Sequence, residues 1–136
     1  MNTPNIDNAK KCPWIEKVTF IPYDITSNNT SNLFEHFNFP DKIIHLAWKG
    51  LPNYNNPFHL VENLPNDFNF LRNLVINGAK DISITGTCFE YGLQEGCLDE
   101  TMNTYPNNYY ALAKDTLRKS LELFQLQHTF DLKWIR

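Results

Sequence analysis

Three side chains in the second half of the sequence are suited to moving a proton on and off a carbon-bound oxygen. Tyr110 and Lys114 are four residues apart, so on a helix they share one face, one turn from each other. A tyrosine, whose pKa is ordinarily about 10, exchanges a proton near neutral pH only if that pKa is lowered, as a nearby cation does. The Thr87 hydroxyl can hold the reacting oxygen and stabilise charge that develops on it. The set predicts proton transfer in carbonyl–alcohol chemistry.

The elements that position these side chains alternate between strand and helix. Short apolar runs predict strands at Val18–Pro22, Lys42–Trp48, Asp81–Thr85 and Phe130–Ile135. Apolar residues spaced by three and four predict helices at Phe58–Asn77 and Tyr109–His128, and a weaker one at Ser27–Phe37. The alternation predicts one α/β unit over residues 1–136, with a parallel sheet. Thr87 then follows the carboxyl end of a strand, where such sheets bind ligands.

The order of these motifs resembles the extended short-chain dehydrogenase/reductases of the NAD-dependent epimerase/dehydratase type. The resemblance rests on the strand, on the run GTCFEYG from Gly86 to Gly92, on Pro106, and on Tyr-Ala-Leu-Ala-Lys from Tyr110 to Lys114. It implies a partial Rossmann-like, doubly wound parallel sheet. It also implies that Tyr110 donates or accepts the proton, that Lys114 lowers its pKa and holds a ribose, and that Thr87 positions the substrate oxygen.

The resemblance further implies NAD or NADP as the cofactor. The residues that would contact it are Asp24, Ile25, Leu46, Ala47, Trp48, Tyr110 and Lys114. Trp48 departs from the family, which usually has a small residue at this place. None of the five glycines forms the glycine-rich phosphate loop, so we expect the chain to lack the family's first βα unit, and also its carboxyl-terminal substrate domain.

The implied substrate is a nucleotide-linked sugar. In the family's 4,6-dehydratases an Asp-Glu pair follows the catalytic threonine, whereas Cys88 and Phe89 stand there in this sequence. This departure disfavours dehydration and favours 4-keto-6-deoxyhexose reduction or 4-epimerisation. Two alternatives stay open. The chain is a non-catalytic remnant or interaction module that pairs with an intact paralogue through helices 58–77 and 109–128, or it is a misfolded product of a broken gene. The resemblance also implies a homodimer through the same two helices.

Composition excludes several other classes. A net charge of −3 gives no basic surface for nucleic acid, and no apolar stretch approaches the roughly 20 residues that span a membrane. The amino terminus lacks a signal-peptide pattern, so we expect a cytoplasmic protein. The three cysteines, Cys12, Cys88 and Cys97, form no Cys-x-x-Cys pair, and we expect neither disulfides nor a metal site. His45 and His59 are interpreted as strand-end and loop histidines.

Overall fold

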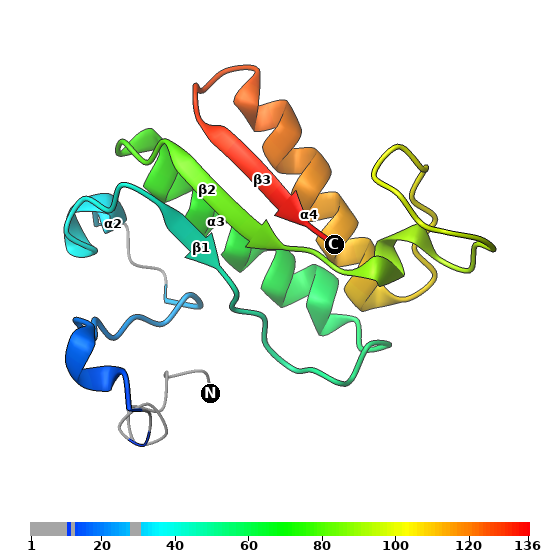
Figure 1. Ribbon diagram of the computed structural model, residues 1–136, viewed down its shortest axis with the longest axis horizontal. Helices are drawn as coiled ribbons and strands as arrows, with labels where there is room; N and C mark the ends of the chain where they lie inside the picture. Colours follow the sequence, from blue (N-terminus) through cyan, green and yellow to red (C-terminus); the bar gives the residue numbers. More distant parts are fainter. Residues whose placement is uncertain (1–10, 12, 28–30) are drawn as a thin grey trace.

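A three-stranded parallel sheet forms the centre of the computed structural model, which describes residues 11, 13–27 and 31–136 (Figure 1). The strands lie in the order β1 (Ile43–His45), β2 (Asp81–Thr85) and β3 (Asp131–Ile135). The predicted α/β class and parallel pairing are therefore confirmed. β2 has its predicted bounds and β3 begins one residue late. β1 ends at His45, so that Leu46, Ala47 and Trp48 follow the strand as a loop.

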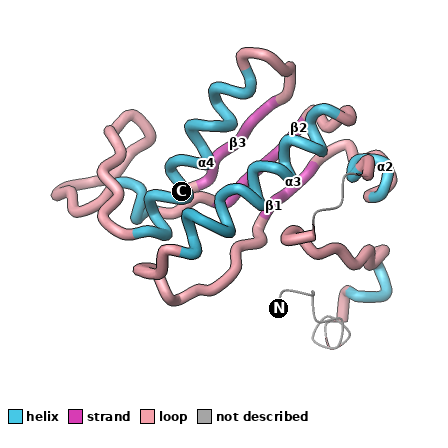
Figure 2. Tube along the Cα trace, turned by 180° about the vertical axis from the view of Figure 1, so that it is seen from behind, coloured by secondary structure: helices cyan, strands magenta, loops and turns pink. Residues whose placement is uncertain are grey.

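Two long helices, α3 (Leu64–Ile76) and α4 (Tyr109–Gln125), lie side by side across one face of the sheet (Figure 2). Their buried leucines meet the central strand in a single core, whose members include Leu71, Leu74, Ile82, Ile84, Leu117 and Leu121. A π-helical turn, η2 (His59–Asn63), leads into α3. Pro65 stands at the start of α3 and has no N–H to continue α-helical bonding into that turn, which accounts for the altered hydrogen-bond pattern there.

The remaining elements are short. They are η1 (Ile15–Lys17), α2 (Leu33–His36) and η3 (Cys88–Tyr91). The weak helix predicted at Ser27–Phe37 is confirmed only for α2, and residues 28–30 of that prediction lie outside the described residues. The strand predicted at Val18–Pro22 is wrong. Apolar, β-branched composition favours an extended backbone, but no strand among the described residues is hydrogen-bonded to this segment.

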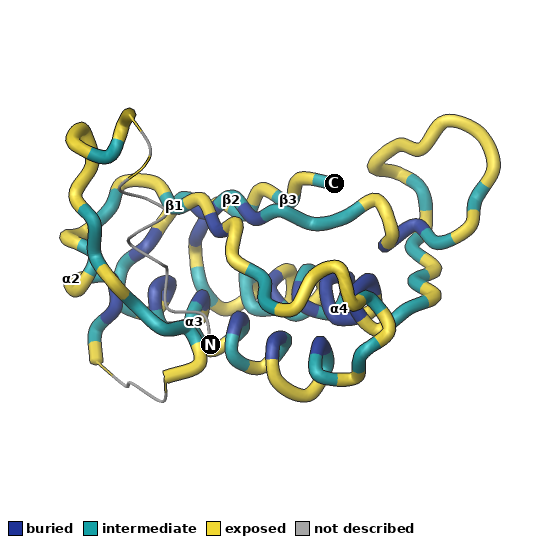
Figure 3. Tube along the Cα trace, turned by 90° about the horizontal axis from the view of Figure 1, so that it is seen from below, coloured by how far each residue is buried: buried dark blue, intermediate teal, exposed yellow. Residues whose placement is uncertain are grey.

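The face of the sheet opposite α3 and α4 is open in the part of the chain that the structure describes (Figure 3). Ile44 is 69% exposed and Leu46 is 66% exposed. Among the described residues, the apolar run through β1 is therefore covered on one face only. Among the same residues, no helix is long and apolar enough to cross a membrane.

Candidate active site

Helix α4 turns Tyr110 and Lys114 inward, one turn apart. The helix begins where the Asn108 side chain accepts a hydrogen bond from the Ala111 N–H at 2.9 Å, an N-cap that fixes the first turn. Tyr110 is 7% exposed and Lys114 is 1% exposed. The structure thus buries the pair that the spacing predicts, at the end of β2, where Lys114 Nζ donates to the Thr85 carbonyl oxygen at 2.8 Å.

Lys114 is an ammonium group in an apolar setting. Its Nζ lies 4.2 Å from the centre of the Trp48 ring, within the range of a cation–π contact. Burial lowers the pKa of Lys114 to about 8, although the negative charges of Asp67 and Glu90 act in the opposite direction. The group therefore changes between its charged and neutral forms in mildly alkaline solution.

Tyr110 packs among aromatic rings. The centres of the Trp48, Tyr54 and His59 rings lie 5.9, 5.5 and 5.4 Å from the centre of its own ring. Burial raises the pKa of Tyr110, and the Thr87 side chain partly offsets this rise. The lowering of this pKa by Lys114 stays a prediction. The Thr87 side chain contributes to the Tyr110 pKa, and Lys114 Nζ bonds to the carbonyl oxygen of Thr85, two residues before Thr87. The three predicted catalytic side chains therefore lie in one neighbourhood.

Thr87 is held by a reciprocal pair of hydrogen bonds with its own short helix, η3. Its Oγ1 accepts from the Phe89 N–H at 3.3 Å, and Glu90 Oε1 accepts from the Thr87 N–H at 2.8 Å. The fully buried Glu90 carboxylate also accepts from Trp134 Nε1 and Arg136 Nε, each at 3.0 Å. Burial raises the pKa of Glu90. Glu90 therefore fastens the Thr87 loop to β3.

Sequence reasoning gave Glu90 no role, although a signal was present. Thr87 and Glu90 have the Thr-x-x-Glu spacing of a capping box, which predicts that the threonine is fixed at a helix start. The Glu90 carboxylate also accepts hydrogen bonds from Trp134 and Arg136, which lie 44 and 46 positions later in the chain. No local pattern carries that information.

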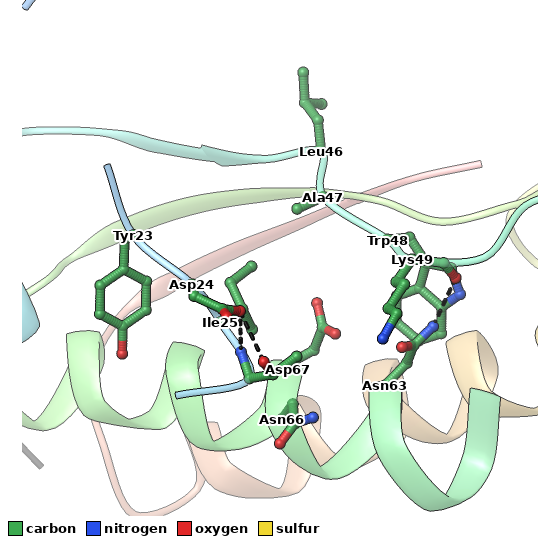
Figure 4. A pocket seen from close by; sticks show the side chains of 11 residues that line it. Tyr23, Asp24, Ile25, Leu46, Ala47, Trp48, Lys49, Asn63, Asn66 and Asp67 are labelled. Carbon is green, nitrogen blue, oxygen red and sulfur yellow. Dashed lines mark hydrogen bonds between the residues drawn. The ribbon is translucent and has the colours of Figure 1, made fainter. Parts of the chain in front are cut away.

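A pocket with a cavity volume of about 460 Å³ opens beyond the end of β1, above the first turns of α3 (Figure 4). Five of the seven predicted cofactor residues line it, and they are Asp24, Ile25, Leu46, Ala47 and Trp48. The other lining residues are Tyr23, Thr26, Lys49, Asn63, Asn66 and Asp67. Leu46 reaches the pocket only at its rim, because its side chain points away from the other labelled residues.

The other two predicted cofactor residues, Tyr110 and Lys114, contact the pocket residue Trp48. Trp48 lines the pocket and also faces Lys114 and Tyr110, so one side chain joins both groups of predicted residues. At the pocket's outer side, the N–H and hydroxyl of Thr26 donate to Asp24 Oδ1 at 2.9 and 2.8 Å. These bonds lower the pKa of Asp24.

Two buried histidines were interpreted from the sequence as a strand-end residue and a loop residue. His45 does end β1, as predicted, but its Nε2 lies 2.5 Å from Oδ1 of Asp67, and both side chains are buried. His59 is not in a loop, because it belongs to the π-helical turn and is fully buried. Burial and partners at this depth come from tertiary packing, which the one-dimensional pattern does not reveal.

No group of metal-ligating side chains occurs among the residues that the structure describes. Cys88 and Cys97 are free and exposed, and Cys12 lies outside the described residues.

Comparison with known proteins places this arrangement in a family. The NAD dependent epimerase/dehydratase family matches residues 2–136. The chain is 33% identical over 95 residues to dTDP-6-deoxy-L-talose 4-dehydrogenase (NAD(+)) of Aggregatibacter actinomycetemcomitans, an alignment that covers 69% of this chain and 35% of that protein. The chain thus spans about a third of the length of this curated relative.

Solved structures agree in fold. UDP-glucuronic acid 4-epimerase of Bacillus cereus, solved with NAD, matches with a TM-score of 0.72 and 16% identity, over 97% of this chain and 41% of the epimerase. RMD from Pseudomonas aeruginosa, solved with NADPH, matches with a TM-score of 0.70 and 21% identity, over 85% of this chain and 42% of RMD. The match over nearly the whole chain shows that it belongs to the NAD-dependent epimerase/dehydratase family.

Proposed function

We propose that this chain is the part of an NAD(P)-dependent oxidoreductase or epimerase of nucleotide-linked sugars that carries proton transfer. The observation that supports this most directly is a convergence. Tyr110 and Lys114 are buried beside Trp48, and Trp48 lines the pocket beyond β1 that contains five predicted cofactor residues. The curated relative is named as a 4-dehydrogenase of a dTDP-linked 6-deoxy sugar, which supports a reaction at the sugar's C4.

The residues present fit a nicotinamide dinucleotide. The pocket offers apolar walls from Ile25 and Ala47 and an ionisable acceptor in Asp24, which suits the nucleoside end of such a cofactor. Lys114 provides a buried cation on the inner side of Trp48, suited to the hydroxyls of a second ribose. When bound, the nicotinamide would supply or accept the hydride.

The chain's own residues handle the proton. Tyr110 gives its hydroxyl proton to the substrate oxygen as a carbonyl becomes an alcohol, and takes it back in the reverse direction. The Lys114 cation stabilises the phenolate that remains. Thr87, held by Glu90, donates a hydrogen bond to the same oxygen and so limits the charge that builds up on it.

Replacement of Tyr110 by phenylalanine tests these roles. Because the chain spans only part of its relative, we would place its 136 residues in that relative's full-length frame and follow NADH formation from dTDP-6-deoxy-L-talose. Tyr110→Phe is expected to reduce kcat by about 10²–10⁴-fold, the usual contribution of a general acid–base group. The neighbouring Tyr109, 42% exposed, supplies the control, and Tyr109→Phe should keep the parent rate.

A Tyr110→Phe enzyme that retains most of its rate would refute the assignment of Tyr110 as the proton donor and acceptor.

A second candidate function, a dimerising module without activity, is favoured by one observation. Apolar side chains on the outer sides of η2 and α4, including Val61 and Leu123, are exposed.

A further inference from the structure

His59 is a buried histidine that the proposed chemistry does not use. Trp48 Nε1 donates to its Nδ1 at 3.0 Å. An indole N–H is only a donor, so Nδ1 is the acceptor and the ring proton sits on Nε2, which donates to the Asn53 carbonyl oxygen at 2.9 Å. The Asn63 amide nitrogen lies 3.2 Å from the same Nδ1. His59 is thus fixed in one tautomer and one orientation by groups on both of its sides.

Trp48 contacts both His59 and Lys114, so the orientation that His59 gives the indole also sets the surface that Lys114 meets. Its ring is close to parallel with that of His59, with an angle of 19° between the planes, and its face lies 4.2 Å from the Lys114 ammonium. The ammonium donates to the Thr85 carbonyl, and the indole face adds a second attraction. The Trp134 ring is more distant, at 6.0 Å.

We propose that His59 is a positioning residue for Lys114. It orients Trp48, whose indole face keeps the ammonium charged and directed at the end of β2 beside Tyr110. Two carboxylates on other elements also favour the charged form, namely Asp67 on α3 and Glu90 on η3. The catalytic consequence rests on the proposed function, whereas the contacts themselves do not.

The first test compares two substitutions of Trp48. The Lys114 side-chain signal is followed against pH by NMR of ¹³C-lysine-labelled chain, and is identified by its loss in Lys114→Arg. Trp48→Phe keeps an aromatic face and should leave the pKa of Lys114 within a few tenths of a unit. Trp48→Leu keeps apolar burial without the π-face, and should lower that pKa by about half to one unit.

The second test asks whether His59 acts through Trp48. His59→Leu removes the acceptor, and should lower the pKa of Lys114 in the parent chain but add nothing in a Trp48→Leu background. His59→Gln supplies another acceptor for the indole N–H and should restore most of the parent titration. His36→Gln, an exposed histidine on α2, is the control and should change nothing.

Equal titration of Lys114 in Trp48→Phe and Trp48→Leu would overturn the inference. A full His59→Leu effect in the Trp48→Leu background would overturn the role of His59. If His59→Leu fails to fold, two measurements still test the inference. They are the comparison of Trp48→Phe with Trp48→Leu, and the chemical shift of the Trp48 indole N–H in His59→Gln. No cofactor or turnover enters these measurements, so failure of the proposed enzymatic function leaves their result readable.

Discussion

Lys114 is the residue at which burial and function conflict most directly. Its pKa falls from 10.5 to about 8 because the folded chain removes the ammonium from water. Between these two values the unfolded chain binds more protons than the folded one. The stability of the fold therefore increases as the pH rises through this window, and below it the charged lysine exerts its full destabilising effect.

This linkage gives a pH-dependent prediction for Lys114→Met. Relative to this variant, the parent chain should gain about 2 kcal/mol in free energy of unfolding between pH 7 and pH 9.5. Urea unfolding at a series of pH values measures it, and the variant cancels the contribution of other groups that titrate in the same range. Parallel pH dependences of the two chains would show that the lysine is not desolvated as described.

For single residues, the sequence predicted which side chains take part in the site better than it predicted the hydrogen bonds that hold them. Thr87, Tyr110 and Lys114 could be found because a helical spacing of four and a strand end are local signals. The capping box of Glu90 was also a local signal, but its contact with β3 and the role of His59 could not be predicted, because the donors come from β3 and from the loop after β1. Such contacts exist only once the chain has folded.

Among the elements, the helical layer of η2, α3 and α4 exposes several apolar side chains. Both long helices bury one side against the sheet, yet Val61 in the preceding π-helical turn and Leu123 on α4 are each exposed, at 69% and 66%. We propose that these sides pair in a homodimer. Burial of a leucine-sized side chain is worth roughly 1.5–3 kcal/mol, so a few such contacts give measurable association.

The dimer is tested by substitution on this surface. Leu123→Glu should weaken self-association by about tenfold or more in sedimentation velocity, because a charge replaces a buried apolar contact. Leu93→Glu is the matched control, since Leu93 is 94% exposed and lies in the loop after η3. A chain that sediments as a monomer at every concentration, or equal effects of the two substitutions, would exclude this interface.

The elements could be predicted where periodicity and tertiary context agree. The helices at α3 and α4 and the strand at β2 have both the expected pattern and the packing partners that the pattern requires. Val18–Pro22 has the composition of a strand, but it has no partner strand within the described part of the chain and forms no strand there. The π-helical turn before Pro65 also escaped prediction, because an apolar spacing of three and four does not distinguish it from an α-helix.

In the whole molecule, five separate segments converge on the ends of β1 and β2. The pocket takes its walls from residues 23–26, from the loop after β1 and from η2 and α3 (Figure 4). The proton-transfer residues come from the N-cap of η3 and from α4. Ligands of open parallel sheets bind at this edge. We propose that these segments form one cofactor site that reaches Lys114.

Titration of the isotope-labelled chain with NAD⁺, followed through backbone and lysine NMR signals, tests this claim most directly. Binding is expected to be weak, because the 136 residues contain no glycine-rich phosphate loop. If the site is continuous, the signals of Asp24, Ile25 and Ala47 should shift saturably together with those of Tyr110 and Lys114. Shifts confined to a different surface, or no saturable shift at these five residues, would contradict it.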